Sequence, residues 1–516
     1  MINTRKTAVG SSIPEYDDFY PIWRRTRAVL GGERAAKEHD AVLDSVDFSN
    51  LLIPFSPSMT PAQYRWYLAE AELPGMTSQY SKVLLGGLLR KPPSIVLPPS
   101  IPEEAMTWIN SGFTEDNRPI LAFLDEAVYE ELCTSRCWIS VDYPVVENYE
   151  SMSPEERAAI VPYPVVWRAE DVINWQTAYD YAESKPKLSR VVFRYLDRDF
   201  SENPYHSDFL ITVMDCAIDE NGHYRIQYYQ RTTEADVDVT NGRLDMSPHG
   251  SQDLYGEGEW VPVGEPIYPT IAGEPMTELP IWPLNGEIDL RPPLLTPLID
   301  KEVALYNKMS RRNHLLYGAS TYTPILKSDM LPEDFEAIVS RGLGSWIQIG
   351  KDDTIDVLTT PVEALTDLDR AIEAAASEMA NLGTRLLSPD FAESGIAMQI
   401  RNAPQTAQLG TLNSRLSSTM KQVIATMLHW RYGTPIDPSE VEFTLSDDFN
   451  SGALSQDAAY MLTEWYQSRL IPRSVWLQSI KKLELIPSDY DDVEGQNEIS
   501  KDTLLMEGQE PIMEEG

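Results

Sequence analysis

The chain has 516 residues, of which 80 are acidic and 42 are basic, so its formal net charge is −38. The length favours about two to four domains, and the hydrophobic share of 42% excludes a globally disordered chain. The acidity argues against a free nucleic-acid binder, because such a protein normally presents a basic face. It leaves open a surface that faces DNA without holding it, since like-sign charge repels a polyanion.

The cysteines and the N-terminus indicate the compartment. Cys133, Cys137 and Cys216 have no fourth cysteine and no histidine at ligand spacing, so we expect no zinc and a reducing environment. The first residues lack an apolar signal-peptide core, and no run of about 18 apolar residues occurs, so we expect neither a signal peptide nor a membrane span.

The N-terminal part is predicted to be helical after a flexible tail of residues 1–14. Helices are expected over 14–30, 60–75, 77–89 and 119–133. The second begins with Thr60 as N-cap, Pro61 at N1 and Gln63 at N3, the pattern of a capping box. Aromatic residues along one side of the first helix favour packing against another domain or subunit.

From about residue 135 to 290 the pattern changes to strands. Five segments alternate or are rich in β-forming residues: CWISVDYP, VPYPVVWR, RVVFRYLDRDF, DFLITVMDCAID and HYRIQYYQRT. Asn221-Gly222 is a strong signal for a hairpin. Residues 168–176 are expected to form a helical turn or an extended link, and residues 236–260 an exposed hairpin tip. The region is therefore predicted to be largely antiparallel β.

A helical hairpin follows, with helices over 297–317 and 361–387 and a strand-bearing insertion of residues 318–360. Within the insertion we expect strands over 321–328 and 345–358 and a short helix over 331–342 between them. The second helix carries a heptad pattern of apolar residues, which needs a packing partner along its length. Its members are Leu365, Leu368, Ile372, Ala375, Met379, Leu382 and Leu386. A polar loop over 388–402 is expected next.

The C-terminal part is predicted to contain a helix over 409–432 with one apolar stripe, a strand near residues 441–449, and two amphipathic helices over 455–469 and 472–483. Residues 488–516 hold ten acids and one lysine, which indicates a disordered acidic tail.

Motifs of catalysis are not found. The glycines around Gly344 and Gly350 have the wrong spacing for a phosphate loop, and no GxSxG, HExxH or GxGxxG sequence is present. No histidine lies within four residues of another. We therefore expect no catalytic residue, no metal and no cofactor. Paired carboxylates leave one alternative, a β-domain enzyme such as a glycoside hydrolase.

Basic residues are scarce enough for their positions to be informative. The first long helix carries Lys301, Lys308, Arg311 and Arg312. Further cationic or polar donors follow at the end of the second helix and beyond it: Arg385, Gln399, Arg401, Asn402 and Gln405. Two interpretations are open. The cations on the helix form salt bridges to the second helix, or the whole set makes transient contacts with a passing phosphate backbone.

Several segments, in their order along the chain, resemble the portal proteins of tailed bacteriophages, the head-to-tail connectors, and in particular a subfamily long known only as a domain of unknown function. They are LLGGLLRKPPSIVL, CWISVDYP, AEDVINWQ, LPIWPLNGE with RPPLLTPLIDKEVALYNKMS, SEMANLGTRLLSP, and ESGIAMQIRNAPQTAQLGTLNSRLSSTMKQVIATML. The resemblance spans residues 15 to 485.

The resemblance implies an α+β portal fold in a ring oligomer. The wing would comprise residues 15–296 and 403–450, the stem helices 297–317 and 361–387, the clip 318–360 and the tunnel loop 388–402. The crown would comprise residues 451–487, followed by the acidic tail 488–516.

The resemblance also implies a function. The protein would form a ring of twelve copies at one capsid vertex, assembled in the host cytoplasm and retained in the virion. It would bind the terminase large subunit, the major capsid protein and head–tail adaptor or tail proteins, and double-stranded DNA would pass through it during packaging and ejection. It would be no enzyme and would contact no membrane. The alternatives from the sequence are the β-domain enzyme and another virion scaffold protein.

Overall fold

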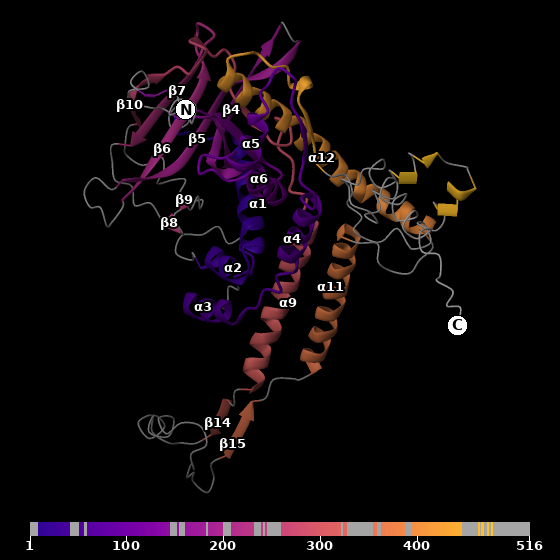
Figure 1. Cartoon of the computed structure of the whole chain (residues 1–516). Helices are drawn as coiled ribbons and strands as arrows, with labels where there is room; N and C mark the ends of the chain where they lie inside the picture. The colour runs from indigo at the N-terminus through magenta and orange to yellow at the C-terminus, as the bar shows by residue number, and fades with distance from the viewer. Residues whose placement is uncertain are drawn as a thin grey trace, which may run out of the picture. The chain divides into compact units, whose positions relative to one another are not determined.

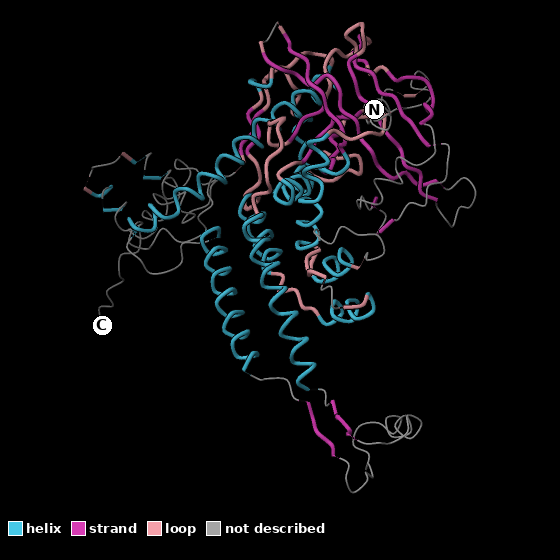
Figure 2. Tube along the Cα trace, turned by 180° about the vertical axis from the view of Figure 1, so that it is seen from behind, coloured by secondary structure: helices cyan, strands magenta, loops and turns pink. Residues whose placement is uncertain are grey.

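The computed structural model describes residues 9–41, 51–55, 59–144, 152–153, 160–181, 184–199, 208–231, 239–240, 243–244, 260–320, 323–327, 354–358, 363–387, 395–445, and short pieces between 463 and 477. The chain forms two compact units. The first comprises residues 1–387 and 399–447, and the second comprises residues 388–398 and 448–516. Figures 1 and 2 show the described elements from two opposite sides.

Six helices precede the main sheets. They are α1 (Pro14–Leu30), α2 (Glu33–Asp40), α3 (Pro61–Glu70), α4 (Met76–Leu88), α5 (Glu104–Ser111) and α6 (Ile120–Thr134). The four predicted helices are confirmed, whereas α2 and α5 were not predicted. The capping box is also confirmed, since the Thr60 hydroxyl accepts from the Gln63 N–H and the Gln63 side chain accepts from the Thr60 N–H. The prediction that α3 continues to residue 75 was wrong: α3 ends at Glu70 and Ala71 is already extended, with ψ 139°. Pro74 further disfavours helical backbone at residue 73.

The β region contains two main antiparallel sheets. The five-stranded sheet has the order β10-β7-β6-β5-β4, with β4 (Val172–Asp180), β5 (Lys185–Asp199), β6 (Asp208–Ile218), β7 (Tyr224–Arg231) and β10 (Trp260–Ile267). The three-stranded sheet has the order β13-β2-β3, with β2 (Cys137–Asp142), β3 (Tyr163–Arg168) and β13 (Ile281–Pro283). The predicted hairpin at Asn221-Gly222 joins β6 to β7, and Gly222 has the positive φ of 83° that such a turn requires.

The link over 168–176 combines both predicted forms. It contains a 3₁₀ turn, η4 (Ala169–Asp171), followed by β4 as an edge strand of the larger sheet. Together with the helices, these sheets confirm the predicted α+β class.

The larger sheet is covered on both faces. In β5, Val191 and Phe193 pack in a cluster with Trp138 of β2, whereas Val192 packs in a second cluster with Tyr16 and other residues of α1. This alternation follows from the two-residue period of a strand. The smaller sheet therefore covers one face and α1 covers the other.

The prediction of a flexible tail over residues 1–14 was wrong for residues 9–14. The Ile13 N–H donates to the Ile173 carbonyl at 3.1 Å, and Pro14 begins α1. Gly10 lies against the Trp260 ring so closely that a Cβ would come within 2.5 Å of it. Apolar contacts hold this segment to the sheet, and Gly10 allows its backbone to approach the Trp260 ring. The sequence of the segment has neither a helical nor a strand-like period, so its pattern does not reveal these contacts. Residues 1–8 lie outside the described part.

The helical hairpin consists of α9 (Thr296–Ser320) and α11 (Glu363–Leu387), with β14 (Thr323–Lys327) and β15 (Thr354–Leu358) paired antiparallel between them. Figure 1 shows the two helices side by side, with the strands beyond their ends. The two predicted helices are confirmed, and the two predicted strands are confirmed over 323–327 and 354–358, the parts of them that the structure describes. The short helix predicted between those strands lies outside the described residues.

The last long element is α12 (Gly395–Tyr432), which is followed by η5 (Pro438–Glu440) and β16 (Glu442–Thr444). The predicted apolar stripe is confirmed at its centre, because Leu416, Met420 and Ile424 are fully buried. Strand β16 pairs with β1 (Ser94–Val96), which joins chain segments that are distant in sequence.

The prediction of a polar loop over 388–402 was wrong for residues 395–402, which are helical. This stretch contains the helix formers Ala397, Met398, Gln399 and Arg401, which favour a helix, and the helix continues through Pro404. The remaining paired strands are short: β8 (Val239–Thr240) with β9 (Arg243–Leu244), and β11 (Thr270–Ile271) with β12 (Glu274–Pro275).

In the second unit only short pieces are described. The Ser468 N–H donates to the Glu464 carbonyl and the Trp476 N–H to the Pro472 carbonyl, which are helical bonds inside both predicted helices. The rings of Tyr466 and Trp476 stack at 4.7 Å. The acidic tail lies outside the described residues.

Candidate functional site

The antiparallel pair of α9 and α11 is the candidate site. Each helix has 25 residues and is therefore about 37 Å long. Lys301 of α9 pairs with Glu378 of α11 at 2.6 Å, and Arg312 of α9 pairs with Asp369 of α11. The two ion pairs run in opposite directions along the two helices, as an antiparallel arrangement requires.

The apolar seam of α11 is only partly covered in the single chain. Met379 is fully buried and Ala375 is 9% exposed. Four further seam residues are half-buried: Leu365, Leu368, Ile372 and Leu382. The side chain of Leu386 lies outside the described part. The seam is therefore covered at Ala375 and Met379, and it keeps accessible apolar surface before and after these two positions.

The opposite side of α9 is fixed by side chains that bind backbone groups of other elements. The carboxylate of Glu302, which is fully buried, accepts from the N–H groups of Met76 and Thr77 at 2.9 and 2.7 Å. These N–H groups begin α4, where a helix leaves donors without intrahelical partners. The side-chain amide of Asn307 donates to the Leu52 carbonyl at 2.7 Å.

Two of the basic residues on α9 follow the salt-bridge interpretation, because Lys301 and Arg312 are bound to α11. Lys308 lies near Glu378 and contributes to lowering the pKa of that carboxylate, after the larger effect of Lys301. Arg311 is exposed, and its charge acts on Tyr67 of α3. Contact of any of them with DNA stays a prediction.

The other predicted DNA-contact residues lie on helices rather than in a loop. Arg385 is in the last turn of α11, and α12 contains the remaining four: Gln399, Arg401, Asn402 and Gln405. Their side chains lie outside the described part, so their contacts with DNA are also untested predictions.

The entry to α9 is fixed by a buried polar network. Glu131 of α6 accepts from the Cys137 N–H at 2.9 Å and from the Asn285 side-chain amide at 3.0 Å. Burial raises the pKa of Glu131 to about 7, although Arg136 and these hydrogen bonds act in the other direction. The Arg136 guanidinium donates to the carbonyls of residues 287–289. This network orients the segment that leads into α9.

The chemistry of the remaining described residues is that of a packed core. All three cysteines are free and buried, and burial raises the pKa values of the Cys133 and Cys216 thiols to about 12. Within the described ranges, no cluster of three or more potential metal ligands is found. Among the same residues, no helix is long and apolar enough to cross a membrane.

The sequence reasoning missed the residues that fix α9, namely Glu302, Asn307 and Asn313. Asn313 donates to the Glu70 carbonyl at 3.3 Å. One signal was available, because Glu302 interrupts an apolar stripe that includes Leu298 and Leu305. A charged residue in such a position needs a buried partner. The identity of that partner, the N-terminus of α4, depends on tertiary contacts.

No protein-family model matches this chain, and no curated protein matches it. Among solved structures, it is similar to a chain of the virion of a native gene transfer agent particle, with 10% identity over 76% of this chain and 84% of that chain and a TM-score of 0.30. It is also similar to a chain of the neck of an empty gene transfer agent particle, computed with C6 symmetry, with 11% identity over 75% of this chain and 84% of that chain and a TM-score of 0.32. Similarity at this level carries no argument about function.

Proposed function

We propose that this chain is a portal protein, a subunit of a ring at one capsid vertex through which double-stranded DNA passes during packaging and ejection. The observation that carries the proposal is the antiparallel pair of α9 and α11, with the paired strands β14 and β15 between the two helices in chain order. This arrangement follows a mixed helical and β region and precedes the long helix α12. It has the same order as the stem, the clip and the later wing helix in the family that the sequence resembles.

The surface of α11 supports assembly into a ring. Four residues of its heptad seam are half-buried in the single chain, and apolar surface of this kind is usually covered by a packing partner. We propose that the partner is the helical pair of the next subunit. Helices about 37 Å long in a closed ring would make a deep collar.

The charge distribution supports a channel that DNA crosses without being held. Twelve copies would carry 12 × −38 = −456 formal charges. The ion pairs of Lys301 and Arg312 with α11 use two of the few cations on α9. A negative wall with few available cations repels a polyanion and limits tight binding.

In this proposal the chain has no catalytic residue, and the ATPase is its partner, the terminase large subunit. The region around β14 and β15 would bind the terminase and the adaptors, and the β region would meet the major capsid protein.

Light scattering coupled to size-exclusion chromatography tests the assembly. A ring of twelve has an expected mass of about 700 kDa, twelve times 58.3 kDa. Negative-stain images should show a ring with a central hole. A monomer or a dimer would contradict the proposal and would favour the enzyme alternative, whereas a large assembly without a hole would favour another virion scaffold protein.

The DNA contact needs its own experiment. Lys308→Glu and Arg401→Glu remove cations that no described ion pair uses, so the pairing of α9 with α11 should persist. We expect the length of packaged genome to change in particles that carry these variants. An unchanged length would exclude both residues from contact with DNA.

A further inference from the structure

Three large side chains are exposed on the α3 side of the α9 C-terminal half. Trp66 of α3 is 56% exposed, and Leu316 and Tyr317 of α9 are 45% and 47% exposed. The rings of Trp66 and Tyr317 lie 6.0 Å apart. Tryptophan and tyrosine with exposed rings are the residue types that most often dominate the binding energy of protein interfaces. We refer to these three residues as the aromatic patch.

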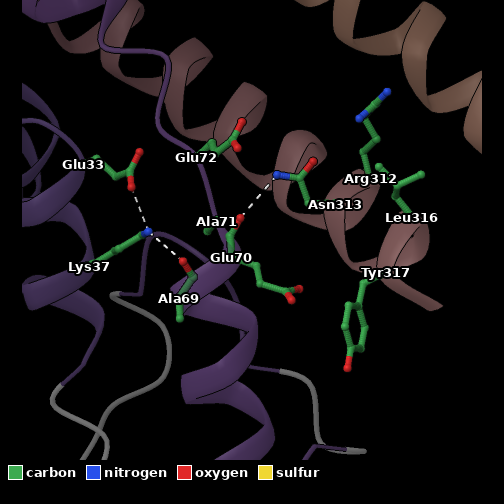
Figure 3. Close-up of a pocket in the computed structure, with 10 residues that line it drawn as sticks. All are labelled: Glu33, Lys37, Ala69, Glu70, Ala71, Glu72, Arg312, Asn313, Leu316 and Tyr317. Carbon is green, nitrogen blue, oxygen red and sulfur yellow. Dashed lines mark hydrogen bonds and ion pairs between the residues drawn. The ribbon is translucent and has the colours of Figure 1, made fainter. Parts of the chain in front are cut away.

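A hollow of about 640 Å³ adjoins the aromatic patch and lies between α2, the α3–α4 connection and α9. Leu316 and Tyr317 line it, as do the carboxylate-bearing residues Glu33, Glu70 and Glu72. Figure 3 shows these side chains around the hollow. The aromatic patch and these three carboxylates therefore belong to one continuous surface.

The two cations that line the hollow already have partners. The Lys37 ammonium donates to Glu33 Oε1 at 2.8 Å and to the Ala69 carbonyl at 2.9 Å. Arg312 pairs with Asp369 of α11, and Figure 3 shows it extending away from Lys37. Neither cation is therefore directed at Glu70.

Glu70 has an acceptor that is shielded from water. Its Oε1 accepts from the Trp66 indole N–H at 3.0 Å. Its Oε2 is buried and has no hydrogen-bond partner among the described residues. A shielded carboxylate oxygen without a donor costs free energy, and an incoming cationic donor would remove that cost.

We propose that the aromatic patch and Glu70 bind a segment of a different protein that presents an arginine next to an apolar side chain. The guanidinium would donate to Glu70 Oε2, which a rotation of the half-buried Glu70 side chain would bring to the surface, and would lie over the Trp66 ring. This arrangement combines a charge-assisted hydrogen bond with a cation–π contact. The apolar side chain would cover Leu316 and Tyr317. The carboxylates disfavour a nucleic acid in this place. This proposal does not depend on ring assembly.

The test uses the full chain and two blocked tripeptides, Ac-Leu-Arg-Leu-NH₂ and its neutral analogue with citrulline in place of arginine. Binding is measured by saturation-transfer NMR titration. We expect the arginine peptide to bind about tenfold more tightly than the citrulline peptide, as a hydrogen bond to a shielded carboxylate implies. In Glu70→Gln this preference should fall below about twofold, while in Trp66→Ala both peptides should bind about tenfold more weakly.

A matched control separates this surface from exposed aromatic residues in general. Tyr181 is 87% exposed and belongs to the turn between β4 and β5, so Tyr181→Ala should leave both affinities unchanged. Thermal melting midpoints of Glu70→Gln and Trp66→Ala within about 2 °C of the parent chain would show that both variants fold.

Three results would overturn the proposal. They are absence of binding by the arginine peptide, equal affinities for the two peptides, and a change of the light-scattering mass in Trp66→Ala. The last result would assign the aromatic patch to a contact between copies of this chain. The mass of the parent chain tests the proposed portal function separately, so the two proposals can fail independently.

Discussion

The two sides of α9 are held by different kinds of interaction. Towards α4 and the α2–α3 connection, the fully buried Glu302 and the half-buried Asn307 bind backbone groups directly. Towards α11, the ion pairs of Lys301 and Arg312 are accessible to water, and among the α11 side chains that the structure describes, 365–382, only Met379 and Ala375 are buried. Buried polar contacts are costly to break, whereas exposed ion pairs contribute little and weaken with salt. The structure therefore predicts that α9 is fixed to the helical region and that α11 is the more easily separated member of the pair.

The strongest challenge to this comparison is Glu302→Ala. It removes both acceptors at the N-terminus of α4 and leaves the buried Thr77 N–H and the half-buried Met76 N–H without a partner, so we expect a loss of about 4 kcal/mol in the free energy of unfolding. Urea denaturation followed by circular dichroism measures it. Asp300→Ala is the matched control, because Asp300 is 53% exposed in its pair with Arg25. A loss no larger than in the control would mean that α9 is not fixed through Glu302.

On the other side of α9, Met379→Ala tests the apolar part of the contact with α11. Met379 is fully buried, so truncation should cost about 3 kcal/mol. Leu382→Ala, at a half-buried seam position one turn further along, should cost less in the isolated chain. Hydrogen exchange measured on both variants should show faster exchange in α11 than in α9. Equal acceleration in the two helices would contradict the comparison.

The entry to α9 adds a pH dependence. The folded-state pKa of Glu131, about 7, lies above its ordinary value of 4.5, so the folded state binds more protons in this interval. The stability that this group contributes is therefore complete below about pH 4.5 and is lost as the pH rises through about 7. We expect Glu131→Gln to reduce the fall in unfolding free energy between pH 5 and 8 by about 2 kcal/mol. Parallel pH profiles of the parent and the variant would exclude this contribution.

The smallest effect is expected for the ion pair between Arg312 and Asp369, whose side chains are 37% and 45% exposed. A double-mutant cycle with alanine at both positions should give a coupling of about 0.5 kcal/mol at low salt. In 0.5 M NaCl the coupling should become too small to measure. A coupling above about 2 kcal/mol that persists in salt would place this pair among the fixed contacts.

Local signals in the sequence predicted the elements well where they were strong. The capping box at Thr60 and Gln63 marked the start of α3, Asn221-Gly222 marked the hairpin between β6 and β7, and the heptad pattern marked α11. The α+β class followed from the change of period between the helical and β regions. These signals act within a few residues, which is why they can be recognised without a partner.

The failures have a common physical cause. The segment before α1 is ordered by Trp260 and Ile173, which are more than 150 positions away, and nothing in its own pattern indicates that contact. The start of α12 was missed because its polar residues were interpreted as a loop, whereas the structure continues the helix back to Gly395.

The sequence by itself determined most of the long helices and strands and the acidic character of this protein, because propensity, period and charge are properties of neighbouring residues. It did not indicate α2, α5 or the first turns of α12. It did predict α9 and α11. For the cations on α9 it left two interpretations open, salt bridges to α11 or contacts with a phosphate backbone. Only the tertiary structure decided that Lys301 and Arg312 pair with α11, that Glu302 binds the N-terminus of α4, and that Trp66 meets Tyr317 beside Glu70. Each of these contacts joins residues at least 57 positions apart, and at such separations the fold alone determines which groups meet.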